Sequence, residues 1–113
     1  MMKFESNELY QKAVKVAVTI RNVCESASRQ VEESATMIAK ASVTFNPALQ
    51  RNRYRRARWM VQGAYTSLRV MEDVEALAGT IAPERREKLA GYKALLVELN
   101  GSIRDKVRAL ISE

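Results

Sequence analysis

The sequence predicts an all-α protein that folds as an antiparallel four-helix bundle with up-down-up-down topology. The 113 residues include only four glycines and two prolines, and neither residue type occurs before Pro47. Apolar residues recur at spacings of three and four through four successive segments, as they do on the buried faces of helices. Hydrophobic residues make up 47% and charged residues 28% of the chain, which is typical of one folded domain spanning residues 1–113.

The first two predicted helices follow each other closely. The first runs from about Ser6, its expected N-cap, to Ala27, and the second runs from about Ser28 to Thr44. The core stripe of the first helix consists of Leu9, Ala13, Val16, Ile20, Val23 and Ala27. The core stripe of the second consists of Val31, Ala35, Ile38, Ser42 and Phe45. Because only the serine-rich stretch 25–28 separates them, one long helix is an alternative to two.

The last two predicted helices have clearer ends. The third begins at Asn46-Pro47, with Asn as N-cap and Pro at the first helical position, and ends at Gly79. Its core stripe consists of Ala57, Met60 or Val61, Ala64, Leu68, Met71 and Ala78. The fourth begins at Pro83, with acids in its first turn and bases near its end, which suits the helix dipole. Its core stripe consists of Leu89, Tyr92, Leu96, Leu99, Ile103, Val107 and Leu110.

Arginine is concentrated in the first half of the third predicted helix. The chain has a net charge of +6, and six arginines but no acid lie between Pro47 and Met71. Most of these arginines fall within about 60° of one another, roughly opposite the core stripe. Their guanidinium groups could bind phosphates, and the neighbouring aromatic residues could stack on unpaired bases. The predicted nucleic-acid site consists of Arg51, Arg53, Arg55, Arg56, Arg58, Arg69, Tyr54 and Trp59.

Two of these arginines conflict with a simple helix surface. Arg53 and Arg56 fall toward the core side of the wheel, so we expect this end to project beyond the bundle or to be covered by a polar partner. No acid lies three or four residues away from the five arginines at positions 51–58 to neutralise them. The alternative is a solvated helix face in which Tyr54 and Trp59 are packing residues.

Five other apolar residues lie off the core stripes. Val14 and Val18 point away from the stripe of the first helix, and Trp59, Val70 and Leu77 share another direction on the third. Together they predict a second apolar face that forms a subunit contact in a homo-oligomer. A wider bundle that buries both faces is the alternative.

The residue types needed for most catalysis are missing. The chain has no histidine, no glycine-rich phosphate loop and one cysteine, so we expect no enzymatic activity, metal or cofactor. We expect the acids Glu72, Asp73 and Glu75 to form surface salt bridges rather than a metal site. Cys24 is expected to be a small buried residue, and the lack of a cysteine pair favours the cytoplasm. No membrane span or signal peptide is predicted.

Four short stretches, spread over nearly the whole chain, resemble the bacterial four helix bundle protein family. They are residues 9–13, 38–43, 64–72 and 79–84, which read LYQKA, IAKASV, AYTSLRVME and GTIAPE. One branch of the family is encoded within intervening sequences of ribosomal RNA genes. The other comprises the accessory variability determinants of diversity-generating retroelements. Residues 43–51 read VTFNPALQR and lack the Glu-Gly typical of the ribosomal branch, which favours the second branch.

The resemblance implies a function and partners. Accessory variability determinants are small, basic, all-helical proteins that form a pentameric barrel and bind a reverse transcriptase and nucleic acid. By resemblance, this chain would be a non-enzymatic accessory protein with RNA or DNA, a reverse transcriptase and its own copies as partners. A ribosomal-branch protein, or an interaction module whose arginines bind an acidic protein without nucleic acid, are the alternatives.

Overall fold

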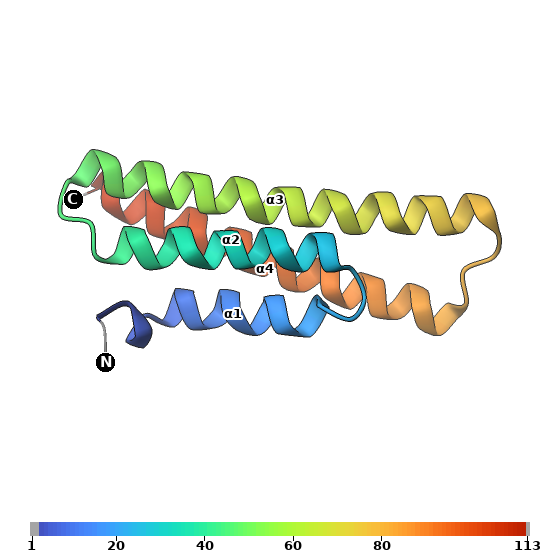
Figure 1. The fold of residues 1–113 in the computed structure, drawn as a ribbon. Helices are drawn as coiled ribbons and strands as arrows, with labels where there is room; N and C mark the ends of the chain where they lie inside the picture. The colour runs from blue at the N-terminus through green and yellow to red at the C-terminus, as the bar shows by residue number, and fades with distance from the viewer. Residues whose placement is uncertain (1–2, 113) are drawn as a thin grey trace.

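A computed structural model describes residues 3–112 of the chain. It contains four α-helices, and helices that follow one another along the chain pack side by side, which confirms the predicted all-α up-down-up-down bundle (Figure 1). The helices are α1 (Glu8–Ile20), α2 (Glu25–Ser42), α3 (Pro47–Ala78) and α4 (Pro83–Ser112), and a 3-10 turn at Lys3–Ser6 precedes them. The molecule is elongated, with principal extents of 50 × 28 × 17 Å.

The first two helices are separate, and their ends differ from the prediction. The N-cap of α1 is Asn7, whose side-chain oxygen accepts a hydrogen bond from the Tyr10 N–H at 2.9 Å. The predicted cap, Ser6, belongs to the 3-10 turn instead. The chain turns at residues 21–24, not at the predicted 25–28.

A contact between helices explains why the chain does not turn at residues 25–28. Ser28 is buried within α2, and its hydroxyl donates a hydrogen bond to the Ala17 carbonyl of α1 at 2.8 Å. A serine whose hydroxyl bonds a neighbouring helix does not compete with its own backbone, so it does not end the helix. Cys24 precedes α2 in an extended conformation and makes no side-chain cap. It is half-buried rather than fully buried.

The ends of α3 are as predicted. The Asn46 side chain accepts a hydrogen bond from the Leu49 N–H at 3.1 Å, and Pro47 occupies the first turn. Gly79 follows the last helical residue and donates its N–H to the Glu75 carbonyl. After a connection of four residues, 79–82, α4 begins at Pro83 as expected.

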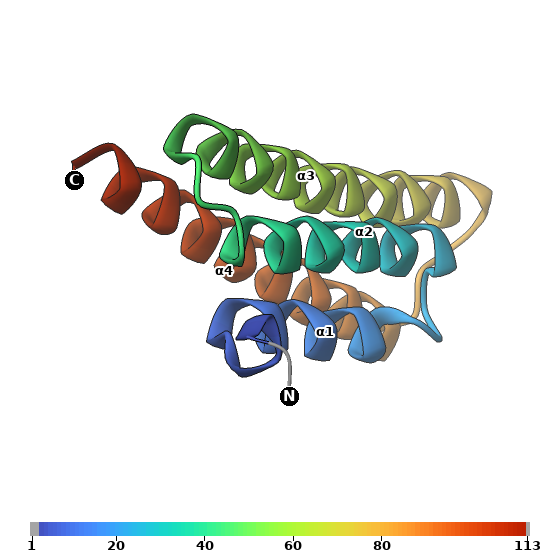
Figure 2. The ribbon, with the colours of Figure 1, turned by 60° about the vertical axis from the view of Figure 1, so that its left-hand side comes forward.

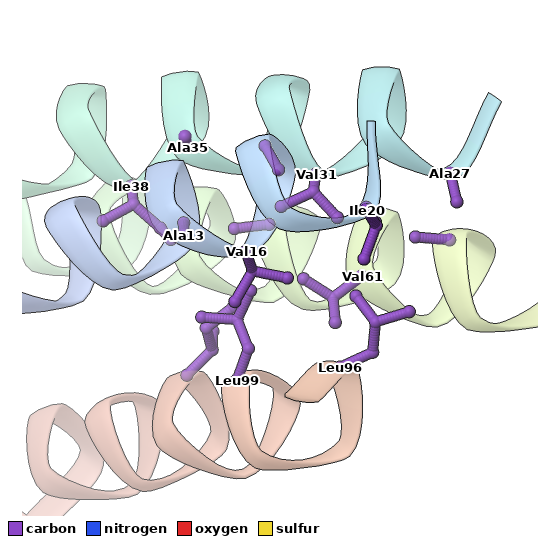
Figure 3. Packing of buried hydrophobic residues seen from close by; sticks show 14 of the residues in the cluster. Ala13, Val16, Ile20, Ala27, Val31, Ala35, Ile38, Val61, Leu96 and Leu99 are labelled. Carbon is purple, nitrogen blue, oxygen red and sulfur yellow. The ribbon is translucent and has the colours of Figure 1, made fainter. Parts of the chain in front are cut away.

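The predicted stripes form most of the core. In the close-up of Figure 3, Val16 of α1 points toward Leu99 of α4, and Val61 of α3 lies beside Leu96. Of the two predicted alternatives for the core of α3, Val61 is correct, because it is buried and Met60 is only partly buried. Five stripe residues, Leu9, Val23, Met71, Tyr92 and Leu110, are partly buried at the edge of the core.

Three stripe residues do not belong to the core. Phe45 is 94% exposed because α2 ends at Ser42 and no helix covers the connection that follows. Ser42 is half-buried on the last turn of α2. Ala78 is exposed because it lies at the far end of α3, beyond the reach of α1 and α2. The helical spacing does not apply to Phe45, which lies after the end of α2, and it does not indicate where a neighbouring helix ends, as for Ala78.

Small residues on α2 allow close packing on both sides. Its buried face includes Ala27, Ser28, Ser34, Ala35 and Ala41. The Ser34 hydroxyl donates to the Ala57 carbonyl of α3 at 2.9 Å, as Ser28 does to α1. Each buried hydroxyl therefore has its partner on a neighbouring helix, and α2 joins α1 and α3 directly.

The second helix pair is longer than the first. α3 has 32 residues and α4 has 30, whereas α1 has 13 and α2 has 18. Gln30, near the start of α2, donates to Ser67 of α3 at 2.9 Å, so α3 continues beyond α2 from about residue 70. Figure 1 shows α3 and α4 extending together past the other two helices. We call residues 70–91 of this extension the distal arm.

Ion pairs join the two helices of the distal arm to each other and to the bundle. Arg85 of α4 pairs with Glu75 of α3 at 2.8 Å, and Lys93 pairs with Glu72 at 3.1 Å. With no third helix on the arm, the outward apolar residues Val70, Val74 and Leu77 stay exposed.

We predict that enlarging Ser34 destabilises the bundle. Ser34 has no exposed surface, so Ser34→Leu must push α2 away from α3 and lose the hydrogen bond to Ala57. We expect the free energy of unfolding to fall by about 1–3 kcal/mol, measured by urea denaturation followed by circular dichroism. The control is Thr36→Leu on the exposed side of the same helix, for which we expect little change. Equal stability of the two variants would contradict the close α2–α3 contact.

Candidate nucleic-acid interface

The five arginines at positions 51–58 all lie on the first part of α3. Arg55 and Arg56 are exposed, and Arg51, Arg53 and Arg58 are half-buried. Within residues 3–112, none of the five forms an ion pair with a carboxylate. The positive charge of this region is therefore not neutralised by the acids that the structure describes.

Arg53 has a structural role that the sequence did not indicate. Its guanidinium donates to the Thr44 hydroxyl at 2.6 Å and to the Lys40 carbonyl at 3.5 Å. These acceptors lie at the C-terminal end of α2, where free carbonyl groups and the negative end of the dipole favour a cation. The expectation that Arg53 needs a projecting helix end or a polar partner is wrong, because α2 itself satisfies it.

The other arginines differ in how freely they can bind a ligand. Arg58 donates from Nε to the Asn100 side-chain oxygen of α4 at 3.2 Å, which fixes its orientation. Arg56 is exposed on the outer side of α3, so the expectation that it points toward the core is also wrong. Arg69 pairs with Asp73 one turn further along α3 at 3.3 Å. Arg69 therefore extends the positive surface less than its charge suggests.

Tyr54 belongs to the core, so its predicted stacking role is wrong. It is 1% exposed and is the largest fully buried side chain in the described region. Its direction on α3 matches that of Ala57 and Val61, which are also buried. Burial raises the pKa of the Tyr54 hydroxyl above its usual value. Of the two alternatives for this residue, the packing interpretation is correct.

Trp59 has the opposite environment. Its side chain is 74% exposed, and with Asn52, Arg55 and Arg56 it lines a shallow hollow of about 400 Å³. An exposed indole beside two guanidinium groups offers a flat surface for stacking and cations for a phosphate. Trp59 therefore keeps its place in the candidate site.

Two arginines of α4 were missed from the sequence. α3 and α4 are antiparallel, and the Arg58–Asn100 hydrogen bond places residues 51–55 of α3 level with about residues 103–107 of α4. Arg104 and Arg108 follow Asn100 at intervals of four, so they lie near the side of α4 that carries Asn100, and Arg104 also pairs with the neighbouring Asp105 at 3.5 Å. That spacing could have indicated them. We call the combined surface the basic face; it consists of Arg51, Arg55, Arg56, Arg58, Arg104 and Arg108.

The five residues of the predicted second apolar face are exposed, but they form two patches. Val14 and Val18 lie on α1, whereas Trp59, Val70 and Leu77 lie on α3. In the described chain no Cα atom of α1 lies within 8 Å of one in α3, and Figure 2 shows the two helices on opposite sides of α2. The alternative of a wide bundle that buries both sets is wrong. We call the two sets the α1 patch and the α3 patch.

The acid cluster forms surface salt bridges, as predicted. Glu72, Asp73 and Glu75 each pair with a different cation, namely Lys93, Arg69 and Arg85. The hydrogen bond from Arg85 lowers the pKa of the Glu75 carboxyl and raises that of its own guanidinium. Among residues 3–112 there is no group of three potential ligands that could hold a metal ion.

The comparisons with known proteins identify no relative of this chain. No protein-family model, curated protein or solved structure matches this chain. The all-helical, four-helix architecture is established by the structure alone. In the part of the chain that the structure describes, no helix has the length and apolar character to span a membrane.

We predict that Arg53 and Arg55 differ in their effect on stability. Arg53→Ala removes the hydrogen bonds to the end of α2, and we expect it to lower the free energy of unfolding by about 0.5–1.5 kcal/mol. Arg55→Ala, on an exposed side chain, should change stability by less than about 0.5 kcal/mol. Urea denaturation of both variants tests this. A larger loss of stability in Arg55→Ala than in Arg53→Ala would contradict the structural role of Arg53.

Proposed function

We propose that this protein is a non-enzymatic accessory protein that binds RNA or DNA through its basic face. The observation that carries the proposal is that Arg51, Arg55, Arg56 and Arg58 have no carboxylate partner within residues 3–112. Exposed cations that a protein does not neutralise itself are available to an external polyanion. A phosphate backbone supplies several negative charges at regular spacing, which suits a row of guanidinium groups.

The shape of the basic face fits a nucleic-acid strand. From Arg51 to Arg58 the surface runs about 10 Å along α3 at the helical rise of about 1.5 Å per residue. Arg104 and Arg108 widen it onto α4. Arg58 is held in place by Asn100, so less side-chain freedom is lost when it binds a phosphate.

The two apolar patches support a ring-like homo-oligomer. The α1 patch and the α3 patch lie on two helices that α2 separates. A contact between unlike patches on neighbouring copies is heterologous, and repeated contacts of this kind close into a ring when the rotation between copies permits. A ring would repeat the basic face in every subunit and so strengthen binding to a long polyanion.

The resemblance to a known family favours a particular oligomer and a particular protein partner. The similarity to accessory variability determinants favours a pentamer that docks on a reverse transcriptase in a diversity-generating retroelement. The same arginines could instead bind an acidic protein, and the binding experiment below distinguishes that outcome.

We predict that binding depends on salt and on the arginines of α3. Wild-type protein should bind a fluorescent structured RNA with an affinity that falls steeply as salt rises, because phosphate contacts release counterions. Combined Arg51→Ala, Arg55→Ala and Arg58→Ala should weaken binding for all sequences and reduce the salt slope by about 1 per lost contact. The matched control is Arg21→Ala, an exposed arginine at the end of α1. Circular dichroism checks that the triple variant remains helical.

Affinity that did not change between low and high salt would refute phosphate binding by the basic face. An acidic protein partner would then be the better explanation of the arginines. A high ratio of absorbance at 260 nm to that at 280 nm in purified protein, falling after nuclease treatment, would support the proposal independently.

We predict that both patches are needed for assembly. Val18→Glu and Leu77→Glu each place a charge in one patch, so each variant alone should be monomeric by light scattering after size-exclusion chromatography. In a mixture, the intact α3 patch of the first variant and the intact α1 patch of the second should form dimers. Val43→Glu, at an exposed residue outside both patches, should assemble like the wild type. A monomeric wild-type protein would contradict the ring.

A further inference from the structure

A second, more apolar hollow adjoins the basic face between α3 and α4. It has a volume of about 280 Å³. The buried side chains of Val61 and Leu96 contribute to its lining, and Figure 3 shows them close together between the two helices. Val97, which is 59% exposed, lines it on the solvent side. The hollow therefore combines apolar walls with an open mouth.

Three polar side chains of the lining have unused hydrogen-bonding capacity. Gln62, Tyr65 and Asn100 all line the hollow. Within the described chain, the Gln62 amide and the Tyr65 hydroxyl make no hydrogen bond, and Asn100 uses only its side-chain oxygen, for Arg58. An amide and a hydroxyl can both donate and accept, so together they could match the polar edge of a flat ring.

The hollow lies between cations along α3. Arg58 precedes it and Arg69, which pairs with Asp73, follows it; the two arginines are separated by about 16 Å along the helix at about 1.5 Å per residue. Arg55 lies less than one turn before Arg58. A group that enters the hollow while attached to a phosphate chain would therefore have arginines on both sides.

From this arrangement we infer that the hollow takes one unpaired nucleobase of a single strand whose phosphates lie on the basic face. An unpaired base has apolar faces for Val61, Leu96 and Val97, and a polar edge for Gln62 and Asn100. Tyr65 adds an aromatic ring with a hydroxyl group. In a duplex the pairing edges are occupied and the bases are stacked, so a duplex cannot insert one without opening. The inference rests on the proposed function and names its substrate as single-stranded nucleic acid.

A protein side chain is a poorer occupant. An aliphatic side chain would fill the apolar part but would leave the groups of Gln62, Tyr65 and Asn100 without partners when it excludes water. It would also make no use of the arginines on either side. The charge and the hydrogen-bonding groups thus favour a base over an apolar residue of a partner.

The test compares three labelled DNA probes by fluorescence anisotropy. The probes are a short mixed-sequence single strand, the same strand with abasic sugars throughout, and the corresponding duplex. Wild-type protein should bind the ordinary strand about tenfold more tightly than the abasic strand, the range expected when one base is stacked and hydrogen-bonded. It should also prefer the single strand to the duplex.

Variants of the hollow should remove the preference for the ordinary strand over the abasic strand and should leave phosphate binding unchanged. The double variant Gln62→Ala and Tyr65→Phe should lose most of the tenfold advantage for the ordinary strand and should bind the abasic strand as the wild type does. Both changes should leave the helix intact, because neither side chain makes a hydrogen bond among the described residues and Tyr65→Phe keeps the ring that packs against the core. Asn22→Ala, an exposed amide in the connection between α1 and α2, is the control and should behave like the wild type.

The outcomes separate the two proposals. Equal binding of ordinary and abasic strands by the wild type, with loss of both in the arginine triple variant, would overturn the base site and leave the basic face intact. No binding of any probe by the wild type would overturn the proposed function itself. An advantage for the ordinary strand that persists in the double variant would place the base elsewhere and also refute the inference.

Discussion

The close contact of α2 with both of its neighbours organises the bundle. Two buried hydroxyl groups, those of Ser28 and Ser34, bond carbonyl groups of α1 and α3, and the alanines around them leave no bulk between the helices. This contact brings the end of α2 beside the first turns of α3, where Arg53 bonds Thr44 and Lys40. Because α2 covers one side of α3, the arginines on the other sides of α3 face solvent or α4.

The positive charge of α3 is concentrated in its first half. Arginines accumulate at positions 51–58 without a carboxylate partner among the described residues, so their guanidinium groups repel one another. Arg53 interacts with the C-terminal end of α2, which favours a cation. Arg58 is oriented by Asn100, and Arg55 and Arg56 remain exposed. An anion bound on the basic face would relieve the repulsion among these groups, so a surface that is unfavourable alone becomes favourable in a complex.

The unequal helix lengths have a consequence for assembly. Because α1 and α2 are short, the distal arm has only two helices and exposes apolar side chains such as Val70 and Leu77. At the other end of α3, Trp59 is exposed beside the basic face. Apolar and cationic surfaces thus follow one another along a single helix, and a partner protein and a nucleic acid could be bound side by side.

Several features could be read from the sequence because they depend on local chemistry. Asn46 and Pro47 begin a helix through a side-chain cap and a fixed backbone angle, and Gly79 follows its end. The spacing of apolar residues identified most of the core, including Ile38 and Leu99. The concentration of arginine on α3 was equally visible, since net charge does not depend on packing.

Other features were decided only by the tertiary structure. Helical periodicity gives the direction of a side chain but not which neighbour lies there, so it left both a stacking and a packing role open for Tyr54 and predicted Ala78 as a core residue. The register of α3 against α4 brought Arg104 and Arg108 level with the α3 arginines and formed the hollow at Tyr65. Helix lengths and register are set by the whole packed bundle, and a single segment of sequence does not contain them.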